Sequence, residues 1–134
     1  MIAVDTSAIV AILEGEEDAE FFKIALENDE YPIISAATFV ELGCIMKHRA
    51  GGRAIELIDQ IFQLLGISVE PLTEEQALIA RKAYYEYGTL NFGDTYSYAL
   101  AKAKKVPLLF EGNDFSKTDI QSCRTLLFPK SAHE

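Results

Sequence analysis

Short apolar segments alternate along this chain with longer stretches of helical periodicity, and this alternation restricts the fold more than any other feature. We predict strands at residues 2–4, 31–35, 66–72, 107–110 and 125–128. We predict helices at residues 8–15, 16–28, 36–49, 53–66, 74–87 and 92–105. Strands and helices that alternate with short connections form an α/β sandwich with a mainly parallel central sheet. No repeat or linker divides the 134 residues, so we expect a single domain over residues 1–134.

Several predicted helices begin after a residue that can cap a helix. Ser35, Thr73 and Asn91 each directly precede a helical pattern, and any of Asp5, Thr6 and Ser7 after the first strand can cap the helix at 8–15. The side chains of such residues accept hydrogen bonds from the free N–H groups of the first helical turn. These positions therefore fix where four of the helices start.

Charge and composition exclude several classes of protein. The formal net charge is −9, which argues against a general basic face that grips nucleic acid, although an enzyme can still reach phosphates through a metal cation. No apolar run is long enough to cross a bilayer, and Asp5 interrupts the apolar N-terminus, which also lacks the basic start of a signal peptide. The two cysteines form neither a disulfide framework nor a zinc pattern. We therefore expect a cytoplasmic protein.

Acidic residues follow or face the predicted strand ends. Asp5 directly follows the first strand, and Asp114 lies just past the strand at 107–110. The carboxyl ends of parallel strands share one edge of the sheet, where ligands bind. Asp94 occupies the first turn of its helix, whose N-terminus faces the same edge. Glu41 lies within the apolar stretch 39–46, where an ionised carboxylate is costly without a partner. We expect these four acids to converge.

Each acid also has an ordinary structural interpretation. Asp5 can serve as a helix cap, and Asp94 as a first-turn acid favoured by the helix dipole. Asp114 can form an Asn-Asp turn, and Glu41 can make a buried hydrogen bond. Glu111 is interpreted as solvent-exposed. The four acids taken together favour a functional site.

Converging carboxylates repel one another, and a divalent cation removes that penalty. Oxygen ligands without His or Cys favour Mg²⁺ or Mn²⁺ over zinc. Such a cation stabilises charge on a phosphate and lowers the pKa of an attacking water. The pattern predicts a metal-dependent phosphohydrolase or nuclease.

The chain resembles the PIN-domain ribonucleases, most closely the VapC-type toxins of toxin–antitoxin modules. The stretches that carry the resemblance are "IAVDTSAIVAIL", "SAATFVELGCIM", "LNFGDTYSYALAK" and "PLLFEGNDFSKTDI". The resemblance extends over nearly the whole chain and implies a PIN-like three-layer sandwich whose central sheet is flanked by helices. It also implies an endoribonuclease that uses Mg²⁺ or Mn²⁺ to hydrolyse RNA, acts as a homodimer and is blocked by a cognate antitoxin protein.

The resemblance also assigns roles to individual residues. By motif, Asp5, Glu41 and Asp94 are the three core acids that bind metal and act in catalysis, and Asp114 is the fourth. Thr6 is a supporting hydroxyl residue that orients the cluster, and Asp119 lies where some relatives carry an additional metal-binding acid. No core acid is missing.

Two alternatives remain. A receiver domain that accepts phosphate needs an acceptor Asp after a central strand and a Lys after the last one. The predicted strand at 66–72 offers Glu70 instead, and Lys130 is poorly placed. A catalytically silent PIN-like module that only binds a partner is the other alternative, and the intact acids count against it.

Overall fold

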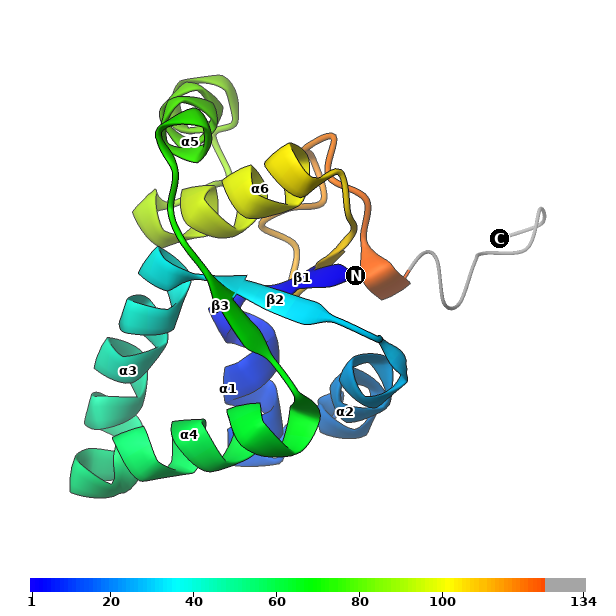
Figure 1. Ribbon diagram of the computed structural model, residues 1–134. Coiled ribbons are helices and arrows are strands. Elements are labelled where there is room, and N and C mark those ends of the chain that lie inside the picture. The colour runs from blue at the N-terminus through cyan, green and yellow to red at the C-terminus, as the bar shows by residue number, and fades with distance from the viewer. Residues whose placement is uncertain (125–134) are drawn as a thin grey trace.

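Parallel strands form the central sheet of the protein (Figure 1). The computed structural model describes residues 1–124. Its strands are β1 (Ile2–Val4), β2 (Pro32–Ser35), β3 (Ser68–Glu70) and β4 (Leu108–Leu109), in the spatial order β3-β2-β1-β4. Every pair of neighbouring strands is parallel, which confirms the predicted parallel sheet. The strand predicted at residues 125–128 lies outside the described residues.

Helices connect the strands and cover both faces of the sheet (Figure 1). They are α1 (Thr6–Glu14), α2 (Ala19–Asn28), α3 (Ala36–Ala50), α4 (Ala54–Leu65), α5 (Glu74–Glu86) and α6 (Phe92–Lys104), with a 3₁₀ turn at Gly51–Arg53. In the described part of the chain, no helix is long and apolar enough to span a membrane.

Alternation along the strands divides the core into two layers, because successive side chains of a strand point to opposite faces. Val4, Ile34 and Leu109 pack into the cluster that contains the buried faces of α1, α2, α3 and α4. Their neighbours Ala3, Ile33 and Leu108 pack instead against α5 and α6. The strand residues of both sets are buried, so the strands read as continuous apolar runs. The predicted three-layer arrangement is confirmed.

The predicted helix caps lie where the sequence places them. The Ser35 hydroxyl accepts a hydrogen bond from Ala37 N (3.2 Å), and the Thr73 hydroxyl accepts one from Gln76 N (3.1 Å). Ser35 is the last residue of β2 as well as the cap of α3, so the chain passes from strand to helix without a loop. This direct passage places the start of α3 at the carboxyl edge of the sheet.

Candidate functional site

Asp5 lies at the carboxyl edge of the sheet, between β1 and α1. Its backbone N donates to Leu109 O (3.0 Å), which fixes it beside the end of β4. Its Oδ2 accepts from Ser7 N (3.1 Å) and the Ser7 hydroxyl (2.8 Å), and its Oδ1 accepts from the Ser97 hydroxyl (2.5 Å). Asp5 therefore caps α1, which agrees with its ordinary structural interpretation. Ser97 of α6 also binds its side chain. Burial raises its pKa despite these hydrogen bonds.

Asp94 is held at the N-terminus of α6 by a reciprocal capping box. The Asn91 side chain accepts from Asp94 N (2.8 Å), while Asp94 Oδ2 accepts from Asn91 N (3.0 Å). Burial raises the pKa of Asp94 to about 6, and the negative charges of Asp5 and Asp114 act in the same direction. The hydrogen bond from Asn91 N opposes this shift. The first-turn position predicted for Asp94 is confirmed.

Glu41 projects from α3 toward the start of α6. A Cβ atom built at Gly93 would overlap the Glu41 carboxyl group, so the bare backbone of Gly93 makes room for it. The expectation that apolar neighbours enclose Glu41 is wrong, because Val40 is 64% exposed and Cys44 is exposed. Burial, and then the charges of Asp5 and Asp94, raise the pKa of Glu41, whereas a hydrogen bond with the Thr6 side chain lowers it.

One cavity of about 300 Å³ receives all four predicted core acids. Its lining residues are Asp5, Thr6, Ser7, Val10, Glu16, Glu41, Ile45, Arg49, Asn91, Asp94, Glu111, Asp114 and Phe115. Asp114 is exposed and follows β4, and its carbonyl accepts from the Thr89 hydroxyl (2.7 Å). We call the cavity that these four acids line the acidic cavity. The structure thus brings together Asp5, Glu41, Asp94 and Asp114, together with Thr6.

Asp119 does not line the acidic cavity. It borders a separate space with Tyr98 and Lys102, forms an ion pair with Lys102, and accepts from the Tyr98 hydroxyl (2.6 Å). Lys102 first, and then the hydrogen bond from Tyr98, lower the pKa of Asp119. The structure therefore separates Asp119 from the acids with which it was grouped as an additional ligand.

Sequence reasoning missed Ser97 and misjudged Glu111. Ser97 follows Asp94 by three residues, and this spacing places both on one side of a helix, which is a signal that a search could use. Glu111 was expected in solvent, but it is half-buried and lines the acidic cavity. Arg49, also at this cavity, forms an ion pair with Glu14 that links α3 to α1.

The donor set of the acidic cavity suits a hard divalent cation in its chemistry, since carboxylate oxygens from four segments line one space. Within residues 1–124, no group of three or more His, Cys, Asp or Glu side chains is arranged to hold a metal ion. Both Asp5 oxygens, and Oδ2 of Asp94, accept hydrogen bonds instead. Each of these oxygens keeps a further lone pair that can bind a cation while the hydrogen bond remains in place.

Comparison with known proteins identifies the family. Residues 2–121 match the PIN domain. Ribonuclease VapC42 of Mycobacterium tuberculosis is 46% identical over 129 residues, which cover 91% of this chain and 98% of that protein. The crystal structure of VapC20 from Mycobacterium tuberculosis, described as a sarcin-ricin loop cleaving toxin, has a TM-score of 0.74 at 21% identity and covers 90% of this chain and 96% of its own. A chain of a toxin–antitoxin complex from Klebsiella pneumoniae has a TM-score of 0.69 at 18% identity. The match covers 89% of this chain and 93% of that chain. The chain therefore belongs to the PIN domain family and, within it, to the VapC ribonucleases.

Proposed function

We propose that the protein is a metal-dependent endoribonuclease and the toxin of a type II toxin–antitoxin module. The observation that carries this proposal is the acidic cavity, which collects Asp5, Glu41, Asp94 and Asp114 from four separate segments. The 46% identity to proteins named as VapC ribonucleases supports the same activity.

The cavity needs a cation before it can accept a phosphate, because its four core carboxylates repel an anion. PIN ribonucleases in general depend on divalent metals. The all-oxygen donor set favours Mg²⁺ or Mn²⁺ here. When bound, the cation supplies charge stabilisation for the phosphate and lowers the pKa of an attacking water. Asp5, Glu41, Asp94 and Asp114 would hold it.

Hydroxyl residues in the cavity and beside it position these carboxylates. Ser7 and Ser97 hold the two oxygens of Asp5, and Thr6 hydrogen-bonds with Glu41, in the supporting role expected of it. In the hydrolysis, the attacking water loses a proton and its oxygen bonds to phosphorus. The bond from phosphorus to the leaving oxygen breaks, and the leaving oxygen takes up a proton. The chain's own groups therefore supply orientation and metal binding.

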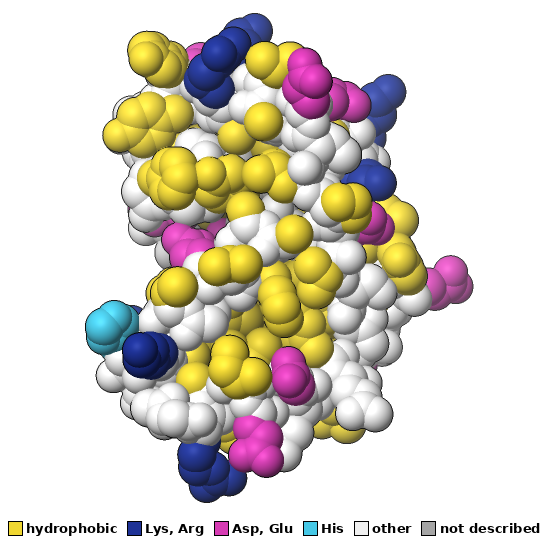
Figure 2. Space-filling view, turned by 60° about the vertical axis from the view of Figure 1, so that its left-hand side comes forward, with side chains coloured by type: hydrophobic (Ala, Val, Ile, Leu, Met, Phe, Trp, Pro, Cys, Tyr) yellow, Lys and Arg dark blue, Asp and Glu magenta, His cyan; other side chains and the backbone are white. Residues whose placement is uncertain are grey.

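We further propose an antitoxin partner and a homodimer. Figure 2 shows hydrophobic atoms spread over one side of the molecule, with acidic atoms in the notch at its left edge. A cavity of about 300 Å³ is lined mostly by residues of α5 and α6, among them Tyr84, Tyr85 and Phe92. Tyr85 is 89% exposed and Phe92 is 71% exposed. Aromatic side chains of this kind are enriched at protein interfaces, and arginines of an antitoxin would match the charge of the acidic cavity.

The proposal predicts Mg²⁺-dependent cleavage of RNA that Asp94→Asn abolishes. We expect the cleavage rate of a labelled single-stranded RNA to fall at least about 100-fold in this variant, because one of the metal-binding carboxylates is lost. Gel analysis of the products, with and without EDTA, provides the measurement.

Asp59→Asn is the matched control, since Asp59 is an exposed acid of α4 that does not line the cavity, and its rate should equal that of the wild type. Cleavage that persists in EDTA would reject the metal-dependent mechanism. Cleavage that Asp94→Asn leaves unchanged would favour a catalytically silent PIN-like module with a contaminating nuclease.

A further inference from the structure

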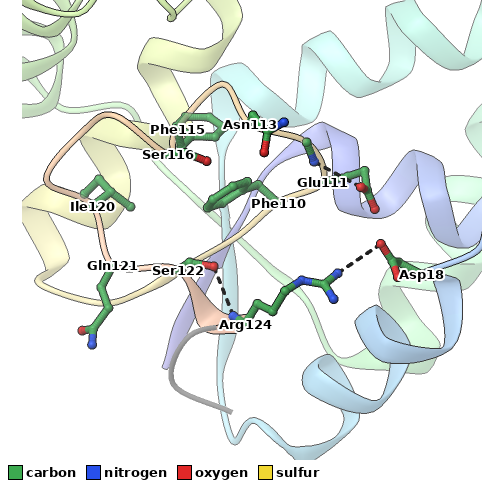
Figure 3. A pocket seen from close by; sticks show the side chains of 11 residues that line it. Asp18, Phe110, Glu111, Asn113, Phe115, Ser116, Ile120, Gln121, Ser122 and Arg124 are labelled. Carbon is green, nitrogen blue, oxygen red and sulfur yellow. Dashed lines mark hydrogen bonds and ion pairs between the residues drawn. The ribbon is translucent and has the colours of Figure 1, made fainter. Parts of the chain in front are cut away.

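A second and larger cavity adjoins the acidic cavity. It has a volume of about 720 Å³ and is formed mainly by the segment 110–124 that follows β4 (Figure 3). Glu111 and Phe115 line both cavities, so the two spaces lie next to each other. Binding sites for small organic groups have volumes in this range. We call this space the flanking cavity.

The lining of the flanking cavity combines an aromatic ring with uncharged polar groups. The half-buried Phe110 ring packs on Phe115, with 5.0 Å between the ring centroids (Figure 3). Asn113, Ser116 and Ser122 contribute amide and hydroxyl groups to the same lining. A planar group can stack on Phe110 while its polar edge meets these side chains.

Hydrogen bonds fix the shape of the segment 110–118. Glu111 N donates to the Ser7 hydroxyl (2.9 Å), the same hydroxyl that donates to Asp5. The Thr118 hydroxyl donates to Phe115 O (2.8 Å), and Ser116 N donates to Asn113 O (3.1 Å). Ser7 therefore ties the wall of the flanking cavity directly to the proposed catalytic acids.

The charges of the flanking cavity discriminate against a phosphate. Asp18 and Glu111 place two carboxylates in the wall. Arg124 is the cation among the described lining residues, and it is already paired with Asp18 (3.1 Å; Figure 3). Its guanidinium group also lies over the Phe21 ring, 4.3 Å from the centroid. An anion entering here would meet more negative than positive charge. An uncharged planar group avoids this repulsion.

We propose that the flanking cavity binds one nucleobase of single-stranded RNA, next to the phosphate that the acidic cavity cleaves. The base stacks on Phe110, and Asn113 contacts its polar edge. This inference rests on the proposed ribonuclease function and adds to it a site that selects the base beside the cut. Unstacked bases of single strands are the part of RNA that proteins read in this way.

A random-sequence pool of single-stranded RNA tests the proposal. After partial cleavage in Mg²⁺, sequencing of the cut ends gives the base frequencies at each position around the cut. We expect the wild type to prefer particular bases at a position close to the cut. Phe110→Leu and Asn113→Ala should each weaken that preference about tenfold, since a stacked or hydrogen-bonded base contact is lost.

Matched variants separate this effect from lost stability. Asn28→Ala removes an exposed asparagine from α2, and Phe62→Leu alters the aromatic pair of Phe39 and Phe62, which lies outside both cavities. Both should keep the wild-type preference. The proposal is wrong if folded Phe110→Leu and Asn113→Ala proteins, checked by thermal melting, cut with an unchanged preference.

A binding experiment makes failure of this proposal distinguishable from failure of the ribonuclease function. In the Asp94→Asn protein, which should not cleave, nucleosides without phosphate are titrated while the side-chain amide signal of Asn113 is followed by NMR. A shift with nucleosides supports base binding even if RNA cleavage fails. A shift with inorganic phosphate alone, or with neither probe, overturns it.

Discussion

At the scale of single residues, the acidic cavity is organised around carboxyl groups that resist ionisation. Burial is the main cause at Asp5, Glu41 and Asp94, and the charges of neighbouring acids add to it at Glu41 and Asp94. A group whose pKa is raised by folding binds its proton more tightly in the folded state. The metal-free protein therefore loses stability as these groups ionise.

The first prediction concerns Asp94, whose pKa rises from 3.8 to about 6. Because the folded state holds this proton more tightly, the free energy of unfolding of the wild type should decrease relative to that of Asp94→Asn as the pH rises from about 4 to 6 in EDTA. At pH 7.5, Asp94→Asn should be more stable than the wild type by about 1 kcal/mol, after allowance for solvent screening. Urea unfolding at several pH values measures both effects.

Excess Mg²⁺ should reverse the order of the two proteins, because a cation that binds only the folded wild type stabilises it. Asp59→Asn should follow the wild type under all of these conditions. A difference in unfolding free energy between the wild type and Asp94→Asn that stays constant from about pH 4 to 6 in EDTA would contradict the cause assigned to the raised pKa.

At the scale of elements, the start of α6 is the part of the fold that the acidic cavity depends on most. The capping box of Asn91 and Asp94 fixes its first turn, and the lack of a side chain at Gly93 admits the Glu41 carboxyl group from α3. Two helices thus meet at a point where only glycine leaves room for an acid.

Gly93→Ala should therefore displace Glu41. The overlapping atoms belong to the end of a flexible side chain, so we expect the unfolding free energy to change by less than about 1 kcal/mol, and the Mg²⁺-dependent cleavage rate to fall about tenfold or more. Gly43→Ala is the control, because its nearest neighbour outside the helix backbone would be Ile55 Cδ1 at 3.8 Å, an ordinary contact. Equal cleavage rates for Gly93→Ala and Gly43→Ala would show that this displacement of Glu41 does not affect cleavage.

Local signals in the sequence predicted most of these elements, because the caps Ser35, Thr73 and Asn91 act on their own helices. The start of α2 was predicted at residue 16, but Gly15 adopts a left-handed conformation after α1 and the chain turns before the helix begins at Ala19. The hydrogen bond from Ser97 to Asp5 joins residues 92 positions apart, so no local pattern reveals it. The ion pair of Asp119 with Lys102 of α6 likewise joins two different segments, and no local pattern reveals it.

At the scale of the whole molecule, apolar side chains remain exposed on the side shown in Figure 2. Among residues 1–124, Tyr85 and Phe92 are the most exposed aromatic residues, and they line one apolar cavity. Burial of such residues is typical of interfaces between proteins.

We expect Tyr85→Glu combined with Phe92→Glu to convert a homodimer into a monomer, because each substitution would bury a charge without a partner. Light scattering coupled to gel filtration gives the mass directly. Ile24→Glu on α2, at a position that is 47% exposed, controls for a charge added elsewhere. If the doubly substituted protein is still a dimer, the interface lies on another surface.

The pairing of β1 with β4 joins the beginning of the chain to a segment more than 100 residues later. Asp5 takes its place only when its backbone N meets Leu109 O, and Asp114 follows that strand. A polypeptide still growing on the ribosome holds three of the four acids yet has no closed site until residue 109 has emerged and paired. A chain built in this way therefore carries no assembled acidic cavity while it is being synthesised.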